Sequence, residues 1–264
     1  MFSIALTFAL KPVSGAAVPA IAHSIRTWLN AGLGFVYPEV CQICGKARAT
    51  PAECFVCAGC RARIRLIQPP FCERCGMPFQ GQITTRFECE NCRDAGLQFQ
   101  YARAAVVAGE QVLELVHRYK YHRAFWCEPL LADFLIRAAG PELKQQHWDL
   151  IVPVPLYPAR QREREFNQAE RLGRRLAAAT GIQLDTRLLK RVRATETQTR
   201  LSREERRRNM HNAFAVNPRR SLSGERIVLI DDVFTTGATT SACSRVLRAA
   251  GAGALCVWTV ARGI

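Results

Sequence analysis

Asp231 and Asp232 follow an apolar run at residues 227–230 and lead into the hydroxyl-rich segment at residues 235–239. The apolar run predicts a buried strand of a parallel sheet, which places both carboxylates at its C-terminal end, where open α/β sheets hold ligands. The backbone amides of the following loop, with a helix from about Thr240, can cradle a phosphate. Carboxylates suit a sugar diol or Mg²⁺. The pattern predicts a site for a phosphorylated sugar; the alternative is a solvated acid pair before an ordinary turn.

The cysteines form a second chemical pattern. Two Cys-x2-Cys pairs separated by twelve residues are followed by two more separated by thirteen. Each set of four thiolates predicts one structural, tetrahedral Zn²⁺, which supplies folding energy to a segment with a thin core. Disulfides are the alternative, but they fit a cytosolic chain poorly. The predicted ligands are Cys41, Cys44, Cys57 and Cys60 for one ion and Cys72, Cys75, Cys89 and Cys92 for the other.

The remaining cysteines carry no such pattern. Cys54 lies three residues before Cys57, so the first frame could instead use Cys54 with Cys57. Cys127, Cys243 and Cys256 occupy apolar stretches and are predicted to be core residues.

Two basic segments add candidate anion sites. Residues 160–168 read as a short basic loop above the end of a strand, and arginines there can donate to neighbouring anionic oxygens. Residues 188–214 hold the densest run of positive charge, with a polar Thr/Gln/Arg loop that we expect to close over a bound group. Ser202 and Glu205 form a capping box before the run Arg206, Arg207 and Arg208, which could equally be a solvated helix face.

Alternating strands and helices must position these groups. Strands are predicted at residues 99–108, 149–156 and 227–230, and helices at residues 111–122, 126–139 and 167–180. Lys120 falls near the turn between the first two helices, where an exposed helix end is the ordinary explanation. With 264 residues, of which 48% are hydrophobic, the chain can build one medium α/β domain and a small module.

Charge and hydropathy limit the function classes. The formal net charge of +15 favours polyanionic partners such as nucleic acid or phosphorylated metabolites. Residues 1–10 are apolar but lack a preceding positive region, so a signal peptide is not expected. Residues 17–35 show helical spacing and are expected to pack on their own domain, because no run is apolar and long enough for a membrane span. We therefore expect a cytoplasmic protein without an integral membrane segment.

The segment at residues 230–239 resembles the 5-phosphoribosyl 1-diphosphate (PRPP) motif of type I phosphoribosyltransferases. The resemblance implies that Asp231 and Asp232 hold the ribose hydroxyls, with Mg²⁺ accompanying PRPP. It implies that the 5′-phosphate is held by Thr235, Thr236, Gly237, Ala238 and Thr239.

The order of all these motifs, from about residue 36 to residue 264, resembles the ComF family. That likeness implies an α/β fold, a type I phosphoribosyltransferase-like parallel sheet with flanking helices, preceded by a double zinc-ribbon module. The implied boundaries are an N-terminal extension at 1–36, the double zinc ribbon at 37–96 and the phosphoribosyltransferase-like domain at 97–264.

The resemblance also assigns roles within the basic segments. It implies catalytic functions for Arg160 and Arg164. It also implies contacts to pyrophosphate, or a place in the loop that closes over it (the hood), for Phe166, Asn167, Gln168, Thr195 and Gln198. The family pattern has Gly where this chain has Glu165, which puts a carboxylate that we expect to be unpaired near the pyrophosphate site.

Two classes of function follow. One is a competence-associated protein that binds PRPP and single-stranded DNA, the latter through Arg206, Arg207 and Arg208, with a helicase of the competence machinery as a possible partner. The other is a phosphoribosyltransferase acting on an unidentified acceptor; a PRPP-sensing regulator is a third possibility. An acceptor pocket would separate them, and the sequence shows none. The oligomeric state stays open.

Overall fold

The computed structural model describes residues 39–79, 81, 85–93, 95–194 and 212–264. Residues 40–264 form one compact unit. The other unit, residues 1–39, lies outside the described residues except for Glu39, and the expected N-terminal helix at residues 17–35 lies outside them too.

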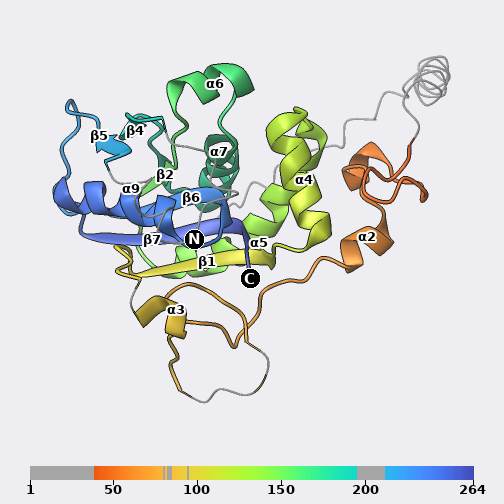
Figure 1. The fold of residues 1–264 in the computed structure, drawn as a ribbon, viewed down its shortest axis with the longest axis horizontal. Helices are drawn as coiled ribbons and strands as arrows, with labels where there is room; N and C mark the ends of the chain where they lie inside the picture. Colours follow the sequence, from red (N-terminus) through yellow and green to blue (C-terminus); the bar gives the residue numbers. More distant parts are fainter. Residues whose placement is uncertain (1–38, 80, 82–84, 94, 195–211) are drawn as a thin grey trace, which may run out of the picture. The chain divides into compact units, whose positions relative to one another are not determined.

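A five-stranded, all-parallel sheet forms the centre of this unit, with strand order β1-β7-β6-β2-β3 (Figure 1). The strands are β1 (Tyr101–Val107), β2 (Leu150–Pro153), β3 (Gln183–Leu184), β6 (Arg226–Phe234) and β7 (Ala254–Arg262). The predicted parallel sheet is confirmed. β6 is longer than expected, because its pairing with β7 continues past the apolar run to Phe234 and so includes the aspartate pair.

Helices cover both faces of the sheet, as the alternation along β6 requires. Val228 and Ile230 pack with α4 (Glu110–Tyr121), α5 (Glu128–Gln145) and α7 (Gln168–Thr180). Ile227 and Leu229 pack on the opposite side with α9 (Ala238–Ala249). This is the period-two burial of a strand covered on both faces. Cys127, Cys243 and Cys256 are buried, as predicted.

One predicted loop is a helix. Residues 158–164 form α6 (Pro158–Arg164), where a basic loop was expected. Pro158 is the first helical residue, a position for which its fixed φ is suited and where its missing N–H costs nothing. The helix ends at Glu165 in the left-handed region. The arginines of this segment are thus fixed on a helix turn.

The two cysteine-rich segments pack on different parts of the α/β unit. The first holds a short 3-10 helix η1 (Pro51–Glu53) and α2 (Ala58–Ala62), and Phe55 meets Trp126 of the 3-10 helix η2 (Phe125–Cys127) with ring centroids 6.0 Å apart. The second holds α3 (Glu90–Arg93) and runs along β1, with Ala102 N donating to Arg74 O at 2.8 Å (Figure 1). Buried residues of the first segment belong to the same apolar cluster as those of α4, α5 and α7. Buried residues of the second segment belong to the same apolar cluster as those of α9.

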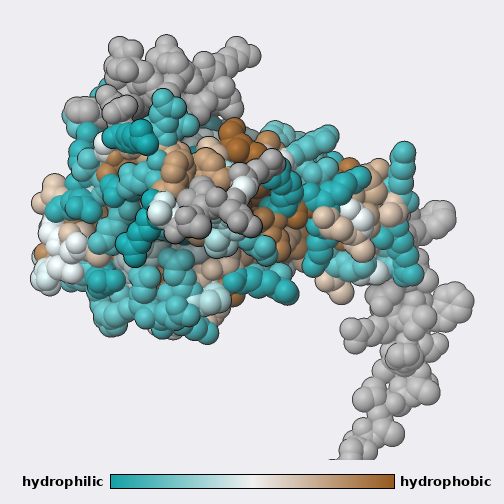
Figure 2. Space-filling view, turned by 90° about the horizontal axis from the view of Figure 1, so that it is seen from below, coloured by the Kyte–Doolittle hydropathy of each residue, from teal (hydrophilic) through white to brown (hydrophobic). Residues whose placement is uncertain are grey.

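A small antiparallel pair completes the described chain: β4 (Leu189–Arg191) with β5 (Phe214–Val216), on either side of residues 195–211. Among the described residues, no helix has the length and apolar character needed to cross a membrane. The face in Figure 2 is mostly hydrophilic, with apolar side chains gathered toward its middle.

Candidate phosphate and metal sites

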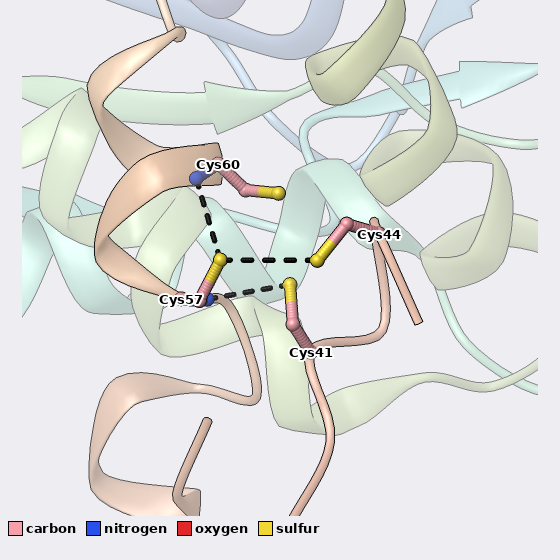
Figure 3. A group of neighbouring side chains, drawn as sticks. All are labelled: Cys41, Cys44, Cys57 and Cys60. Carbon is pink, nitrogen blue, oxygen red and sulfur yellow. Dashed lines mark hydrogen bonds between the residues drawn. The ribbon is translucent and has the colours of Figure 1, made fainter. Parts of the chain in front are cut away.

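The first cysteine cluster brings four sulfur atoms together from two loops and α2. The Sγ atoms of Cys41, Cys44, Cys57 and Cys60 lie within 4.8 Å of one another and point toward a common centre (Figure 3). Cys44 and Cys57 Sγ are 4.0 Å apart, close to the roughly 3.8 Å between ligands of a tetrahedral Zn²⁺ with Zn–S bonds of about 2.3 Å. Backbone N–H groups of Ala47 and Lys46 lower the pKa of the Cys44 thiol to about 6, which favours the thiolate. Cys54 is not one of the four, so the frame uses Cys57 with Cys60.

The second cluster repeats this arrangement more deeply. All four of its cysteines are buried, whereas Cys44 of the first cluster is half-buried. Its sulfur atoms are as closely spaced, with Cys72 and Cys92 3.8 Å apart and Cys75 and Cys89 3.6 Å apart. Four thiolate donors at these separations fit Zn²⁺, and a closed set of four is typical of a structural rather than a catalytic site. Each cluster therefore fits one structural zinc ion.

The aspartate pair lies on β6, close to its C-terminal end. Asp232 is buried, and Asp231 is half-buried. The Asp231 carboxylate accepts from Asp232 N at 2.9 Å, and the Asp232 carboxylate accepts from Val233 N at 2.9 Å. Burial, followed by the neighbouring Asp232 charge, raises the pKa of Asp231 to about 7. This part of the site carries excess negative charge, which a bound cation would relieve.

Lys120 supplies the internal cation of the site. It lies in the last turn of α4, and its Nζ forms an ion pair with Asp232 Oδ2. Burial opposes the charged form, but the Asp232 carboxylate outweighs it and raises the pKa of Lys120. The ordinary explanation of Lys120 as an exposed helix end is wrong, because its side chain is only 21% exposed. No local pattern indicates this ion pair, because Lys120 and Asp232 lie far apart in the sequence.

Two hydrogen-bonded helices fix α4 in place. Tyr119 donates to the buried Glu128 at the start of α5 at 2.9 Å, and Arg175 of α7 donates to the same carboxylate at 2.9 Å. Arg171 of α7 adds a third bond to Glu128. The network thereby fixes the C-terminal turn of α4, which carries Lys120.

The segment after the aspartates has the geometry of an anion cradle. Gly237 is the N-cap of α9 with φ of 77°, and a Cβ there would meet Phe234 Cζ at 2.7 Å. Only glycine fits this turn. Gly237 offers no side chain to cap the helix, so the first turn of α9 directs its positive end at the loop. Thr236 Oγ1 accepts from Ala238 N at 3.4 Å. The helix begins two residues earlier than predicted.

One cavity of about 1110 Å³ collects most of the predicted residues. Its lining combines acidic, basic and hydroxyl groups with the exposed face of α4: Asp231, Asp232, Thr235, Thr236, Gly237, Ala238, Thr239, Lys120, Arg160, Arg164, Gln168 and Arg191. Arg164 donates to Gln168 Oε1 at 2.6 Å and lies over the Tyr121 ring, 5.2 Å from its centroid. Ile43 and Arg63 of the first cysteine-rich segment line the same cavity. The sequence did not indicate that α4 and this segment meet the phosphate loop.

Two predicted contacts face elsewhere. Phe166 is buried against Tyr119 and Phe125, with ring centroids 5.3 and 5.0 Å away. Asn167 is the N-cap of α7, accepts from Ala169 N at 2.9 Å and donates to Val154 O at 3.0 Å. Neither lines the cavity, so within the fold both serve to position α7. Thr195, Gln198, Arg206, Arg207 and Arg208 lie outside the described residues.

Glu165 is not the unpaired carboxylate that we expected. It pairs with Arg123 at 2.6 Å on the surface, and both side chains are more than half exposed. Its φ of 66° lies in the left-handed region, which favours glycine. A glycine at this position would adopt the same backbone conformation without strain.

Comparisons with known proteins agree with this geometry. Residues 32–94 match the double zinc ribbon domain. Competence protein F of Haemophilus influenzae is 33% identical over 215 residues, which are 78% of this chain and 90% of that protein. The chain belongs to the ComF family. The DNA utilization protein YhgH of Salmonella typhimurium is 32% identical over 85% of this chain and 97% of that protein. Competence protein ComFC of Streptococcus pneumoniae is 26% identical over 80% of this chain and 94% of that protein.

Solved structures give a weaker likeness. A purine phosphoribosyltransferase from Pyrococcus horikoshii is 19% identical with a TM-score of 0.33, covering 50% of this chain and 83% of its own. An adenine phosphoribosyltransferase from Leishmania tarentolae is 16% identical with a TM-score of 0.30, covering 64% and 71%. At TM-scores this low the likeness bears on neither the activity nor the site residues.

Proposed function

We propose that this ComF-family protein binds PRPP together with Mg²⁺ in the cavity between β6, α4 and α9, in the cytoplasm. The observation that carries the proposal is the short connection from the aspartate pair to the glycine-capped start of α9, inside a cavity lined by Lys120, Arg160 and Arg164. Acidic groups suit the ribose hydroxyls in the middle of the ligand, and backbone amides and basic groups suit the phosphates at its two ends.

Each part of the ligand has its own partners. The 5′-phosphate lies in the loop at residues 235–239, where amides and threonine hydroxyls donate to it. Asp231 and Asp232 accept from the ribose 2′ and 3′ hydroxyls. Arg160 and Arg164, on one side of the cavity, take the diphosphate. Mg²⁺ fits here because Asp231 carries a charge that lacks a full counter-charge, and Mg²⁺ takes carboxylate and phosphate oxygens.

Calorimetry on the zinc-loaded protein tests this proposal. PRPP with Mg²⁺ should bind more tightly than ribose 5-phosphate or pyrophosphate alone, because each of these occupies only part of the cavity. Asp231→Asn with Asp232→Asn should weaken PRPP binding, since an amide carries no charge for the metal. No heat from the wild type at millimolar PRPP would sink the proposal.

We also propose that the chain binds single-stranded DNA and acts in DNA uptake with a helicase of the competence machinery. The names of the relatives support a role with DNA, and the net charge of +15 supports a polyanionic partner. Arg206, Arg207 and Arg208 are the proposed backbone contacts. Log affinity should fall linearly with log salt, by roughly 0.7 per phosphate neutralised, and changing the three arginines to Gln should flatten that slope. A salt-independent affinity would contradict this.

Phosphoribosyl transfer is the alternative, favoured by the position of Arg160 and Arg164 beside the acid pair. In such a reaction the bond from ribose C1 to the diphosphate breaks, pyrophosphate leaves with the electron pair, and an acceptor nitrogen or oxygen bonds to C1. The arginines stabilise the leaving charge. Pyrophosphate release from PRPP in the presence of nucleobases or single-stranded DNA distinguishes the two. No release with tight PRPP binding supports a binding or sensing protein.

A further inference from the structure

Arg262 is a buried arginine at the end of β7, between the second cysteine cluster and the phosphate loop. The residue is 5% exposed, in a strand whose other residues are all buried. A buried guanidinium requires hydrogen bonds and a compensating negative charge. Within the part of the chain that the structure describes, no carboxylate lies within ion-pair distance of Arg262, so its compensating charge must come from another group.

The second cysteine cluster provides that charge. Arg262 Nε donates to the backbone oxygen of Cys75 at 3.1 Å, and Nη2 lies 3.6 Å from Cys75 Sγ. A Zn²⁺ held by four thiolates carries a net charge of about −2, which makes the second site the anionic partner of the guanidinium. Hydrogen bonds of this kind to ligand atoms orient metal ligands and tune the site.

The other side of the same guanidinium holds the phosphate loop. Nη1 donates to Thr235 O at 2.8 Å and to Phe234 O at 3.3 Å, and also bonds Gly263 O. The guanidinium carbon lies 4.9 Å from the centroid of the Phe234 ring, which packs beneath Gly237. Three loop features therefore depend on one side chain: the two carbonyls that begin the loop, and the ring that supports its glycine.

We infer that Arg262 is a positioning residue that couples zinc occupancy of the second cysteine cluster to the affinity of the loop at residues 235–239 for a phosphorylated ligand. With zinc bound, the cluster's charge holds the guanidinium, and the guanidinium holds the loop in its binding conformation. Without zinc no ion draws the four sulfur atoms together, so Cys75 is free to move and the guanidinium loses the contacts that hold it between the cluster and the loop. The inference rests on the proposed function for the loop itself.

Coupling of this kind is reciprocal. If zinc strengthens phosphate binding by some factor, the bound ligand must strengthen zinc binding at the second site by the same factor. Ligand should therefore protect the second site from chelators more strongly than the first, because Arg262 contacts the second cluster and the first segment reaches the cavity only through Ile43 and Arg63.

The chain offers a matched control in Arg103. This arginine of β1 also ties the second cysteine-rich segment to the sheet, donating to Glu73 O at 2.8 Å and pairing with Glu73 Oε2 at 2.9 Å. Its guanidinium carbon lies 4.5 Å from the Phe71 ring centroid. Like Arg262, it donates to a backbone oxygen of the second cysteine-rich segment and lies over an aromatic ring, but its charge is met by a carboxylate and none of its described hydrogen bonds reaches the loop at residues 235–239.

The experiment compares Arg262→Met, Arg262→Lys and Arg103→Met with the wild type as full-length, zinc-loaded protein. PRPP affinity is measured by calorimetry. Zinc release to a chelator is followed with a metallochromic dye. The kinetic phase that is missing in Cys72→Ser is the one for zinc release from the second cluster, called here the second zinc phase. Arg262→Met should weaken PRPP at least about tenfold, because it removes hydrogen bonds from a charged donor. The PRPP affinity of Arg262→Lys should lie between those of Arg262→Met and the wild type, and the affinity of Arg103→Met should be close to that of the wild type. Bound PRPP should slow the second zinc phase in the wild type and in Arg103→Met, but not in Arg262→Met.

Equal PRPP affinities for Arg262→Met and Arg103→Met at equal zinc content would overturn the inference, as would a second zinc phase that tightly bound PRPP does not slow. If Arg262→Met fails to fold, Arg262→Lys carries the same comparison. Hydrogen exchange of the amides at residues 234–240 serves as a readout without ligand. These amides should lose protection in Arg262→Met and on zinc removal, and unchanged protection overturns the coupling. A wild type that binds no PRPP would refute the proposed function, whereas the exchange measurement judges the coupling independently.

Discussion

The two cysteine clusters share their spacing but support different parts of the fold. The first packs against helices: Phe55 meets Trp126, and Arg118 of α4 donates to Gln42 at 3.2 Å. The second lies along the sheet and reaches the phosphate loop through Arg262. A repeated cysteine motif can thus pack against a helix in one copy and contact the loop at residues 235–239 in the other. The two cysteine frames have nearly the same spacing in the sequence, and they differ in the elements that they contact in the fold.

The strongest test of this difference removes one zinc ligand from each cluster. Cys41→Ser and Cys72→Ser should each lower the zinc content from about two to about one, since a structural site needs its four ligands. Cys72→Ser should weaken PRPP binding much more than Cys41→Ser, because the second cluster contacts the loop through Arg262 whereas the first segment reaches the cavity wall only through Ile43 and Arg63. Elemental analysis and calorimetry measure the two effects. Similar PRPP affinities for both variants would erase the distinction between the clusters.

The helix α4, against which the first cluster packs, can be probed through Lys120. Lys120→Met leaves the buried Asp232 without its cation, and breaking a buried ion pair typically costs about 3 kcal/mol or more of unfolding free energy. Arg137→Met is the control: it removes an exposed pair with Asp133, worth less than about 0.5 kcal/mol. Urea unfolding compares them. A loss no larger than that of the control would show that the Lys120 pair is not a structural contact.

The charge at Asp231 should make PRPP affinity depend on pH without a change in either cysteine cluster. The pKa of Asp231 is raised to about 7, by burial and by Asp232, while Lys120 opposes the rise. The folded protein therefore holds a proton there at acidic pH, and binding of Mg²⁺ with PRPP must release it. Affinity should rise between pH 6 and pH 8, by up to about tenfold per pH unit below the pKa.

Asp231→Asn is the control for that profile, because it removes the titrating group. Its PRPP affinity should be weaker and nearly flat over the same range, apart from the ligand's own phosphate titration. A wild-type profile that tracks the variant would mean that Asp231 is already ionised at pH 6.

The sequence predicted what depends on local pattern. The parallel sheet, the helix at residues 167–180 and the cysteine frames all follow from spacing and turn chemistry within a few residues. The helix at residues 158–164 was missed although Pro158 is a typical first helical residue, because its charged sequence has no apolar period.

Contacts between distant segments could not be read in the same way. Lys120 pairs with a residue of β6, and Arg262 joins a cysteine cluster to a loop. One local sign was available for Arg262: a charged residue ends a strand that is otherwise apolar, and such a charge needs a partner. Which partner it takes depends on how the second cysteine-rich segment lies on the sheet, which no local pattern contains.

The smallest expected effect lies away from both clusters. Glu165 has a φ of 66°, where a residue with a side chain costs about 1 kcal/mol relative to glycine. Its exposed pair with Arg123 returns less than about 0.5 kcal/mol. Glu165→Gly should therefore raise the unfolding free energy slightly, by about 0.5 kcal/mol.

Glu165→Ala separates the two contributions, since it loses the ion pair and keeps the strained backbone; it should be the least stable of the three proteins. Zinc content and second-site zinc release should match the wild type in both variants, because Glu165 contacts neither cluster. If Glu165→Gly proved less stable than the wild type, the pair with Arg123 would outweigh the backbone strain.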